Sequence, residues 1–204
     1  LQEAAPGRWL LNIKRSGSYK VRGIKQGFRE NKARADGPDF NYHATVVKFV
    51  TVRIALSSER AGKVLVMIDI STAFLQSNPY PKGQVKYVSF KSPFDGKWYY
   101  FRQLGPIYGE ASAPARWQDT IAPWLTSSKI GFIRGINEPC VFYHAERDIL
   151  LLLYVDDVLV DALPDDAAWI IELLKEDFEC KDEEYLTQQE ALDYLGMIIS
   201  MDAD

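Results

Sequence analysis

Two adjacent aspartates, Asp156 and Asp157, are the residues of this sequence whose type and spacing best suit chemistry. They stand between the apolar runs 149–155 and 158–160, which predicts a β-hairpin with both carboxylates at its tip. No Lys or Arg occurs within eight residues on either side of the pair. An isolated Asp-Asp pair is usually a solvated acidic turn. The flanking apolar runs favour a second interpretation, in which a divalent cation offsets the repulsion between the two charges.

A third carboxylate, Asp69, ends the predicted buried strand 63–69. Alone it would most simply be a helix cap, but beside Asp156 it would complete a metal site. If the two strand ends are neighbours, Asp69 and Asp156 can bridge two Mg²⁺ ions about 3.5–4 Å apart and support in-line phosphoryl transfer. Mn²⁺ is an alternative, whereas the lack of nearby His or Cys disfavours zinc.

The composition is that of a folded globular protein, with 47% hydrophobic and 25% charged residues. No apolar run approaches the ~20 residues that span a bilayer, and no basic-then-apolar leader precedes Trp9. Cys140 and Cys180 are unclustered, which indicates a reducing compartment. We therefore expect an intracellular protein, cytoplasmic or nuclear and not secreted. Because the chain starts at Leu1, we expect it to be part of something longer.

The net charge of −4 hides a division along the chain. Residues 1–63 hold 13 Lys and Arg against 5 Asp and Glu, and residues 64–204 hold 11 against 23. This pattern favours a polyanion bound by the first part and metals bound by the second, although a gradient without functional meaning is an alternative. Lys20 and Arg22 would share one face of a strand over 19–28, where they could grip a phosphate chain or simply be solvated.

The remaining elements that the sequence predicts are helices over 45–57, 115–126 and 165–178, hairpins within 78–106, a strand at 140–143 and a strand or hairpin at 192–200. Residues 1–18 give no clear prediction. Trp117 and Trp124 are expected in the core. The helix 165–178 should bury Ala168, Ile171, Leu174 and Phe178. The fold class is α+β, with an antiparallel sheet backed by helices.

Several motifs in order carry a family resemblance. Tyr154-Val155-Asp156-Asp157 resembles the signature of reverse transcriptases, and the wider pattern is similar to the Ty1/copia class of LTR retrotransposon polymerases. The other matching segments are Lys20-x-Arg22-x-Ile24 with Gly27-Phe28, Asp69-Ile70-Ser71-Thr72-Ala73-Phe74-Leu75, Ile107-Tyr108-Gly109, Ala113-Pro114, Trp117, Gly131-Phe132, Glu138-Pro139-Cys140-Val141-Phe142 and Tyr194-Leu195-Gly196. The match runs from about Tyr19 to Ser200.

The resemblance implies a right-hand polymerase fold without its thumb. It assigns fingers to 1–62 and 78–112, and palm to 63–77 and 113–204. Asp69 and Asp156 would hold the metals, and Asp157 would be the companion catalytic carboxylate. The expected deoxynucleotide-binding residues are Lys20, Arg22, Phe74, Tyr108 and Gly109, with Phe74 as the steric gate against a 2′-hydroxyl. Leu195, Gly196 and Met197 would form the primer grip.

The implied activity is RNA-directed DNA polymerisation, in which dNTPs are added to a primer 3′-OH on an RNA or DNA template. The implied partners are the remaining Pol segments, namely thumb, RNase H and integrase. The family's Leu-Lys-Gln-Ala-Pro-Arg is altered to Glu110-Ala111-Ser112-Ala113-Pro114-Ala115, with Arg116 displaced by one position. This departure supports an alternative, a catalytically dead remnant that only binds nucleic acid or protein. A nucleotide cyclase is a third alternative, disfavoured by Lys20, Arg22 and the primer-grip resemblance.

Overall fold

A computed structural model describes residues 4–13, 17–31, 35–57 and 61–201. The chain forms two compact units, each built from two separate segments. Unit 1 comprises Leu1–Ala44 and Phe74–Thr120, and unit 2 comprises Thr45–Ala73 and Ile121–Asp204. The unit boundaries cut through the 3₁₀ helix η2 (Ala73–Gln76) and the helix α3 (Ala113–Leu125). Within the described residues, no helix is both long enough and apolar enough to cross a membrane.

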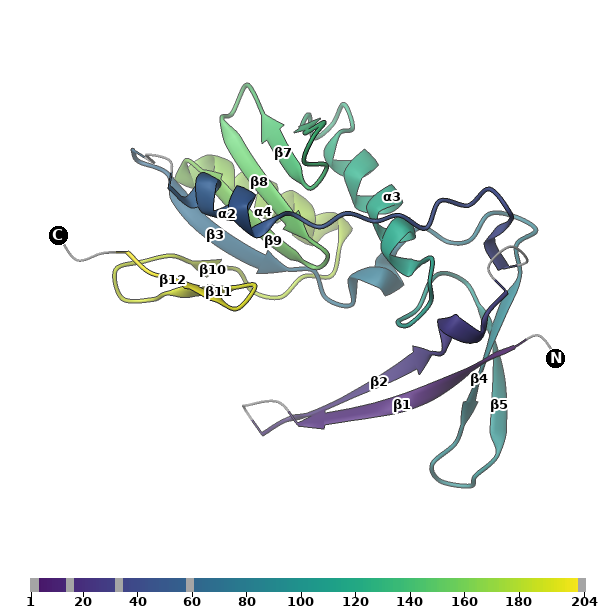
Figure 1. Ribbon diagram of the computed structural model, residues 1–204. Helices are drawn as coiled ribbons and strands as arrows, with labels where there is room; N and C mark the ends of the chain where they lie inside the picture. The colour runs from purple at the N-terminus through teal and green to yellow at the C-terminus, as the bar shows by residue number, and fades with distance from the viewer. Residues whose placement is uncertain (1–3, 14–16, 32–34, 58–60, 202–204) are drawn as a thin grey trace. The chain divides into compact units, whose positions relative to one another are not determined.

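Unit 1 contains a four-stranded sheet in the order β2-β1-β4-β5 (Figure 1). Its strands are β1 (Ala5–Ile13), β2 (Tyr19–Lys25), β4 (Lys86–Lys91) and β5 (Trp98–Gln103), and the 3₁₀ helix η1 (Gly27–Arg29) follows β2. The β1–β2 and β4–β5 pairs are antiparallel, whereas β1 meets β4 in parallel over two residue pairs. The predicted strand at 19–28 and the hairpin within 78–106 are confirmed. No pattern within residues 1–18 predicted β1.

Unit 2 contains a six-stranded antiparallel sheet in the order β10-β3-β9-β8-β7-β6. Its strands are β3 (Val64–Asp69), β6 (Ile133–Arg134), β7 (Val141–His144), β8 (Ile149–Tyr154), β9 (Asp157–Ala162) and β10 (Glu184–Tyr185). A separate hairpin follows, formed by β11 (Leu192–Tyr194) and β12 (Met197–Ile199). The expected α+β class with an antiparallel sheet is confirmed.

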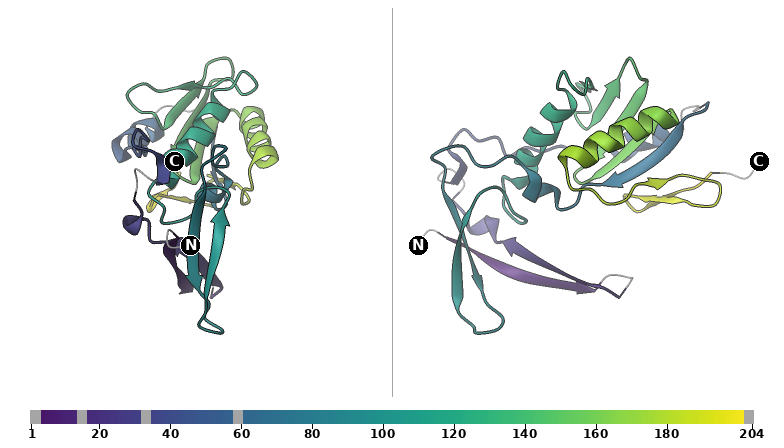
Figure 2. Two further views of the ribbon diagram at one scale, coloured as in Figure 1. Left: turned by 90° about the vertical axis from the view of Figure 1, so that its right-hand side faces the viewer. Right: turned by 180° about the vertical axis from the view of Figure 1, so that it is seen from behind.

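Helices cover both faces of the unit 2 sheet, with α2 (Phe49–Leu56) on one face and α4 (Pro164–Asp177) on the other (Figures 1 and 2). Residues of the central strands β8 and β9 are therefore buried on both faces, which explains their continuous apolar runs. The prediction that Ile171, Leu174 and Phe178 are buried is confirmed, but the prediction for Ala168 is wrong. Ala168 is only half-buried, and the residues buried in the helix are Ala167, Ile170, Ile171 and Leu174.

The two tryptophans that flank the centre of α3 differ in burial. Trp117 is 1% exposed, as expected of a core residue. Trp124 is only half-buried. Its indole Nε1 donates a hydrogen bond to Asp177 Oδ2 at 2.7 Å, and its ring packs edge to face with Phe178. Its position therefore joins α3 to the C-terminal end of α4.

Candidate active site

The hairpin β8–β9 carries the acidic pair, as the sequence predicted. Tyr154 and Asp157 are the last paired residues, so Val155 and Asp156 form a two-residue loop. Val155 has φ +56°, a conformation that glycine favours and that strains a β-branched residue. The loop thus holds strained backbone next to the acidic pair, and such strain is frequent at active sites.

Asp69 lies on the strand next to this hairpin. β3 pairs antiparallel with β9, and the register places Asp69 directly opposite Asp157. The backbone continues the pairing, since Ile70 N donates to Asp156 O at 2.7 Å. The prediction that the two strand ends are neighbours is therefore confirmed. Because paired residues point to the same face, Asp69 and Asp157 share the face that α2 covers.

Lys181 is a contact of the site that sequence reasoning missed. Its Nζ lies 2.5 Å from Asp69 Oδ2, and its backbone N donates to Asp69 O at 2.9 Å. The position follows from the pairing of β10 with β3 and from a bridge between Ile70 and Cys180. Lys181 lies 112 positions beyond Asp69 in the chain, and no local pattern marks it as a neighbour of that residue.

The three carboxylates form an excess of negative charge that one lysine does not balance. Burial, and then the charges of Asp156 and Asp69, raise the pKa of Asp157 to about 6, while Lys181 opposes the rise. The carboxyl oxygens of Asp69, Asp156 and Asp157 are not gathered within 4.8 Å of one another. Hard oxygen donors with unbalanced charge, held on adjacent strands, fit a divalent ion such as Mg²⁺ or Mn²⁺.

The predicted primer-grip residues occupy the tip of the β11–β12 hairpin in the same unit. Leu195 and Gly196 form its two-residue loop with φ +56° and +76°, and Met197 begins β12. Tyr194, just before the loop, is completely buried, and its phenol pKa is raised first by burial and then by the charge of Asp157. The hairpin therefore has its buried side close to the acidic pair.

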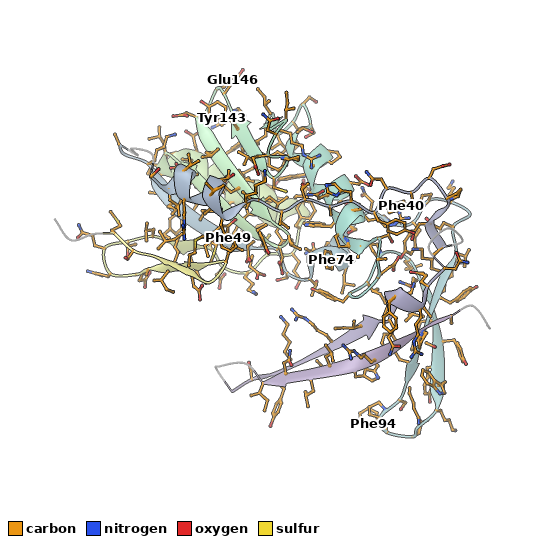
Figure 3. The ribbon with its side chains drawn as sticks, in the orientation of Figure 1. Phe40, Phe49, Phe74, Phe94, Tyr143 and Glu146 are labelled. Carbon is orange, nitrogen blue, oxygen red and sulfur yellow. The ribbon has the colours of Figure 1, made fainter. Side chains whose placement is uncertain are left out.

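All five of the expected nucleotide-binding residues belong to unit 1. Phe74 is labelled in Figure 3. Its ring lies edge to face with the Tyr108 ring at a centroid distance of 5.5 Å, and the Arg22 guanidinium lies 5.2 Å from the Tyr108 centroid. Lys20 lies on the same face of β2 as Arg22, one step along the strand. Tyr108 thus brings together an aromatic residue and a cation from two remote segments.

Gly109 allows the segment carrying Tyr108 to pack tightly against the end of β2. Lys25 N donates to Tyr108 O at 2.8 Å, and Gly27 N donates to Gly109 O at 3.1 Å. Gly109 has φ +81°, and a Cβ there would lie 2.1 Å from Lys25 O. Neither the conformation nor the space would accept another residue.

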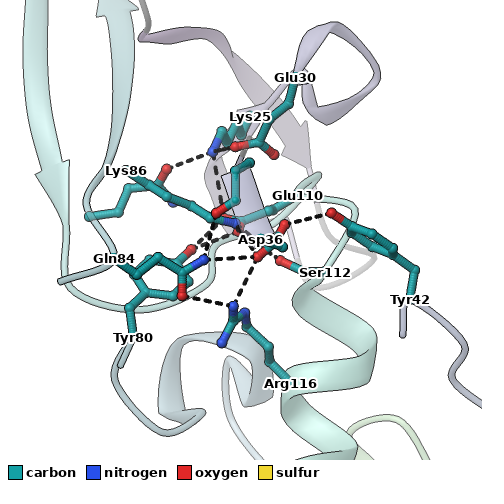
Figure 4. Close-up of polar contacts among 12 residues, drawn as sticks. Lys25, Glu30, Asp36, Tyr42, Tyr80, Gln84, Lys86, Glu110, Ser112 and Arg116 are labelled. Atoms are coloured by element: carbon teal, nitrogen blue, oxygen red, sulfur yellow. Dashed lines mark hydrogen bonds and ion pairs between the residues drawn. The ribbon is translucent and has the colours of Figure 1, made fainter. Parts of the chain in front are cut away.

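A buried ionic network that the sequence did not predict includes Lys25 and Glu110, which adjoin this contact in the chain (Figure 4). Glu110 is its centre, with Lys86 Nζ at 2.5 Å and Lys25 Nζ at 3.8 Å, and the side chains of all three are at most 2% exposed. The other charged members are Glu30, Asp36 and Arg116. Tyr80, Gln103 and Ser112 complete the hydrogen bonds of Glu110.

The network balances three cations against three carboxylates. Oxygens of Glu30, Asp36 and Glu110 lie within 4.8 Å of one another, but the lysines and Arg116 already neutralise them, so this cluster does not fit a metal ion. The altered stretch 110–116 is therefore internally compensated. Arg116 Nη2 contacts Asp36 Oδ1 at 2.9 Å, and Ser112 Oγ donates to Glu110 Oε1 at 2.9 Å.

Comparison with known proteins agrees with this geometry. The family model for reverse transcriptase (RNA-dependent DNA polymerase) matches residues 2–204. A putative transposon Ty5-1 protein of Saccharomyces cerevisiae is 35% identical over 101 residues, which is 47% of this chain and 31% of that protein. The chain thus spans about a third of this curated relative.

Solved telomerase structures share the fold at low sequence identity. Telomerase from Candida albicans, in complex with a fragment of telomeric RNA, aligns with 97% of this chain and 45% of its own, at TM-score 0.50 and 12% identity. Apo telomerase from Candida tropicalis, truncated from its C-terminal domain, aligns with 96% and 53%, at TM-score 0.52 and 11% identity. The chain has a polymerase palm fold and belongs to the family of Ty1/copia-type reverse transcriptases.

Proposed function

We propose that this chain is the RNA-directed DNA polymerase domain of a copia-like retrotransposon and adds dNTPs to a primer 3′-OH. The observation that carries the proposal is the register of β3 and β9, which places Asp69 opposite Asp157. The next residue, Ile70, donates a backbone hydrogen bond to Asp156 O. Unit 2 would serve as the palm and unit 1 as the fingers. On this assignment residues 45–62 belong to the palm, although the sequence motifs suggested fingers.

The acidic cluster would bind and orient the reacting groups. Asp69 and Asp156 would hold the metals, and Asp157 would add a third carboxylate. Bound divalent ions supply activation of the 3′-hydroxyl and stabilisation of the departing pyrophosphate. Lys181 forms an ion pair with Asp69, and this pair would be given up if a metal ion bound to the Asp69 carboxylate. The tip at Leu195, Gly196 and Met197 would support the primer strand.

The unit 1 cluster would select and hold the incoming nucleotide. Lys20 and Arg22 provide cations for the triphosphate, and Arg22 is oriented by Tyr108. Phe74, with its edge against Tyr108, would exclude a 2′-hydroxyl. Phe74→Ala should therefore raise the ratio of ribonucleotide to deoxynucleotide incorporation, whereas Phe40→Ala, at another aromatic position of unit 1, should not. An unchanged ratio would remove the gate from the proposal.

Primer extension tests the activity directly. The protein is incubated with a primed RNA template, dNTPs and Mg²⁺, and the matched control is Asp156→Asn, which keeps the size of the side chain but removes its charge. Extension by the wild type and its loss in Asp156→Asn supports the proposal. Equal signals from both proteins, or none from either with every Pol segment supplied, would favour the inactive remnant.

A further inference from the structure

The outer half of the β1–β2 hairpin is a ribbon of only two strands. β1 and β2 pair from Gly7 with Lys25 to Ile13 with Tyr19, whereas β1 meets β4 over two positions at its start. Within the described residues no third strand pairs with the ribbon beyond that point. A two-stranded ribbon is at best marginally stable in water, so this part of unit 1 requires something to pack on one of its faces.

One side of this ribbon is apolar. Paired residues of an antiparallel ribbon point to the same side, so the side of each pair follows from the register. The pairs on the apolar side are Trp9 with Gly23, Leu11 with Val21, and Ile13 with Tyr19. The alternate positions form the other side, where Arg8, Lys20 and Arg22 stand. Within 8–13 and 19–24 every charged residue therefore lies on that other side.

The apolar side of the ribbon continues onto β4 and β5. The Phe90 ring lies 4.7 Å from the Trp9 ring and 6.4 Å from the Phe101 ring, measured between centroids. Tyr99 is paired with Phe90 and so points to the same side. We call this surface the apolar face and define it by its exposed members, which are Trp9, Leu11, Ile13, Tyr19, Val21, Tyr99 and Phe101.

The apolar face is large for a surface left in water. Its members are between 46% and 73% exposed. Fully covering one aromatic residue removes about 150–250 Å², so exposures of this size leave on the order of 700 Å² of the face in water. The largest apolar patch of a typical monomer is about 300–600 Å², and each partner of a standard protein interface contributes about 800 Å². The apolar face therefore has the area of one side of an interface.

The lack of charge on the apolar face narrows the choice of partner. An anionic lipid surface or an acidic protein would be attracted by cations, but Arg8, Lys20 and Arg22 stand on the other side of the ribbon. A surface without charge is instead compatible with its own copy, because no like charges meet when two such surfaces are brought together. In a twofold interface one patch contacts the same patch of the partner, so self-compatibility is the property that such an interface needs.

We propose that the apolar face is the docking surface for a second copy of this chain. The two β1–β2 ribbons pack face to face about a twofold axis, as the two layers of a small β-sandwich about 10 Å apart. Each ribbon covers the apolar side of the other, which supplies the packing that a two-stranded ribbon lacks on its own. The cations of both ribbons face away from the interface.

Sedimentation velocity of the nuclease-treated chain, over about 1–100 μM, tests the proposal. A standard interface has a dissociation constant in the micromolar range or below, so the wild type should sediment as a dimer. Leu11→Lys should raise the dissociation constant by about 100-fold or more, because each copy then buries a charge that faces its like. The matched control is Asn12→Lys, which adds the same charge at the next exposed position, on the other side of the ribbon. It should change the dissociation constant by less than about threefold.

A second variant separates docking from folding. Tyr19→Lys places the charge on the paired strand and should act like Leu11→Lys, since Tyr19 is 73% exposed. The far-UV circular dichroism spectrum should stay that of the wild type in both variants, because neither position is buried. The dimer should persist in about 1 M NaCl, which screens charges but does not weaken apolar burial.

Several results would overturn the proposal. A wild type that stays monomeric up to about 100 μM would assign the apolar face to a different partner. A dimer that resists both Leu11→Lys and Tyr19→Lys, or that Asn12→Lys weakens equally, would place the interface elsewhere. A dimer that dissociates in about 1 M NaCl would depend on charge rather than on this face. Association is measured without template or nucleotides, so Asp156→Asn should sediment like the wild type whatever the result of primer extension.

Discussion

The buried network around Glu110 allows a quantitative test of how unit 1 is stabilised. Glu110→Gln keeps the shape of the side chain but removes its charge. Lys86 and Lys25, whose side chains are at most 2% exposed, each lose one carboxylate partner. Removing one member of a buried pair costs about 3–5 kcal/mol, because the remaining charge stays desolvated. We therefore expect the free energy of unfolding to fall by roughly that amount.

Two comparisons distinguish the loss of the buried charge from a nonspecific destabilising effect of substitution. Glu138→Gln breaks the ion pair with Lys48, whose side chain is 67% exposed, and should cost less than about 1 kcal/mol. In Glu110→Leu combined with Lys86→Met, an apolar pair replaces the charged pair. This double variant should recover much of the loss, since apolar replacement of a buried ion pair is often neutral or stabilising.

The network also predicts a pH dependence of stability. Burial acts to raise the pKa of Glu110, but the charges of Lys25 and Lys86 outweigh it, so the pKa is lowered from its ordinary 4.5. Stability from this group is therefore present above pH 4.5 and is lost as the pH falls through the folded pKa. Urea unfolding at pH 7 and pH 3.5, followed by circular dichroism, measures both effects. A loss below about 1 kcal/mol in Glu110→Gln at pH 7 would refute the reasoning.

Two further predictions concern the acidic hairpin. Val155→Gly should raise the melting temperature modestly, because relief of a strain of about 1–2 kcal/mol at φ +56° exceeds the entropy cost of glycine. The control is Val158→Gly in the buried strand β9, which should lower the melting temperature strongly. A lower melting temperature for Val155→Gly would contradict the strain argument. Mg²⁺ should raise the melting temperature of the wild type at pH 7.5, since the Asp157 pKa of about 6 leaves the cluster ionised there, and the rise should shrink in Asp69→Asn. An equal rise in both proteins would place the ion elsewhere.

The central part of the fold could be predicted because the sequence patterns there are local. Strand β3 and the hairpin β8–β9 are buried on both faces, so each reads as a continuous apolar run next to an aspartate. β1 was missed because Trp9, Leu11 and Ile13 of its outer half are exposed, and no alternation of buried and polar residues marks it.

The unpredicted parts of the site depend on contacts between remote segments. The Glu110 network joins residues from 25 to 116, and each charge alone has the pattern of a solvated side chain. Lys181 reaches Asp69 only because β10 adds to the edge of the sheet at β3. The residue types at positions 110–116 showed a departure from the family, but not that Lys86 and Lys25 compensate for it.

The interleaving of the two units has a consequence for synthesis on the ribosome. All residues of unit 1 have been translated once position 120 is reached, so its sheet can close early. Strand β3 is made before this point but must wait for β9, which ends at Ala162, before it gains the hydrogen-bonded neighbour that carries the second half of the acidic site. A nascent chain of intermediate length therefore presents an unpaired apolar strand edge, a natural binding site for a chaperone.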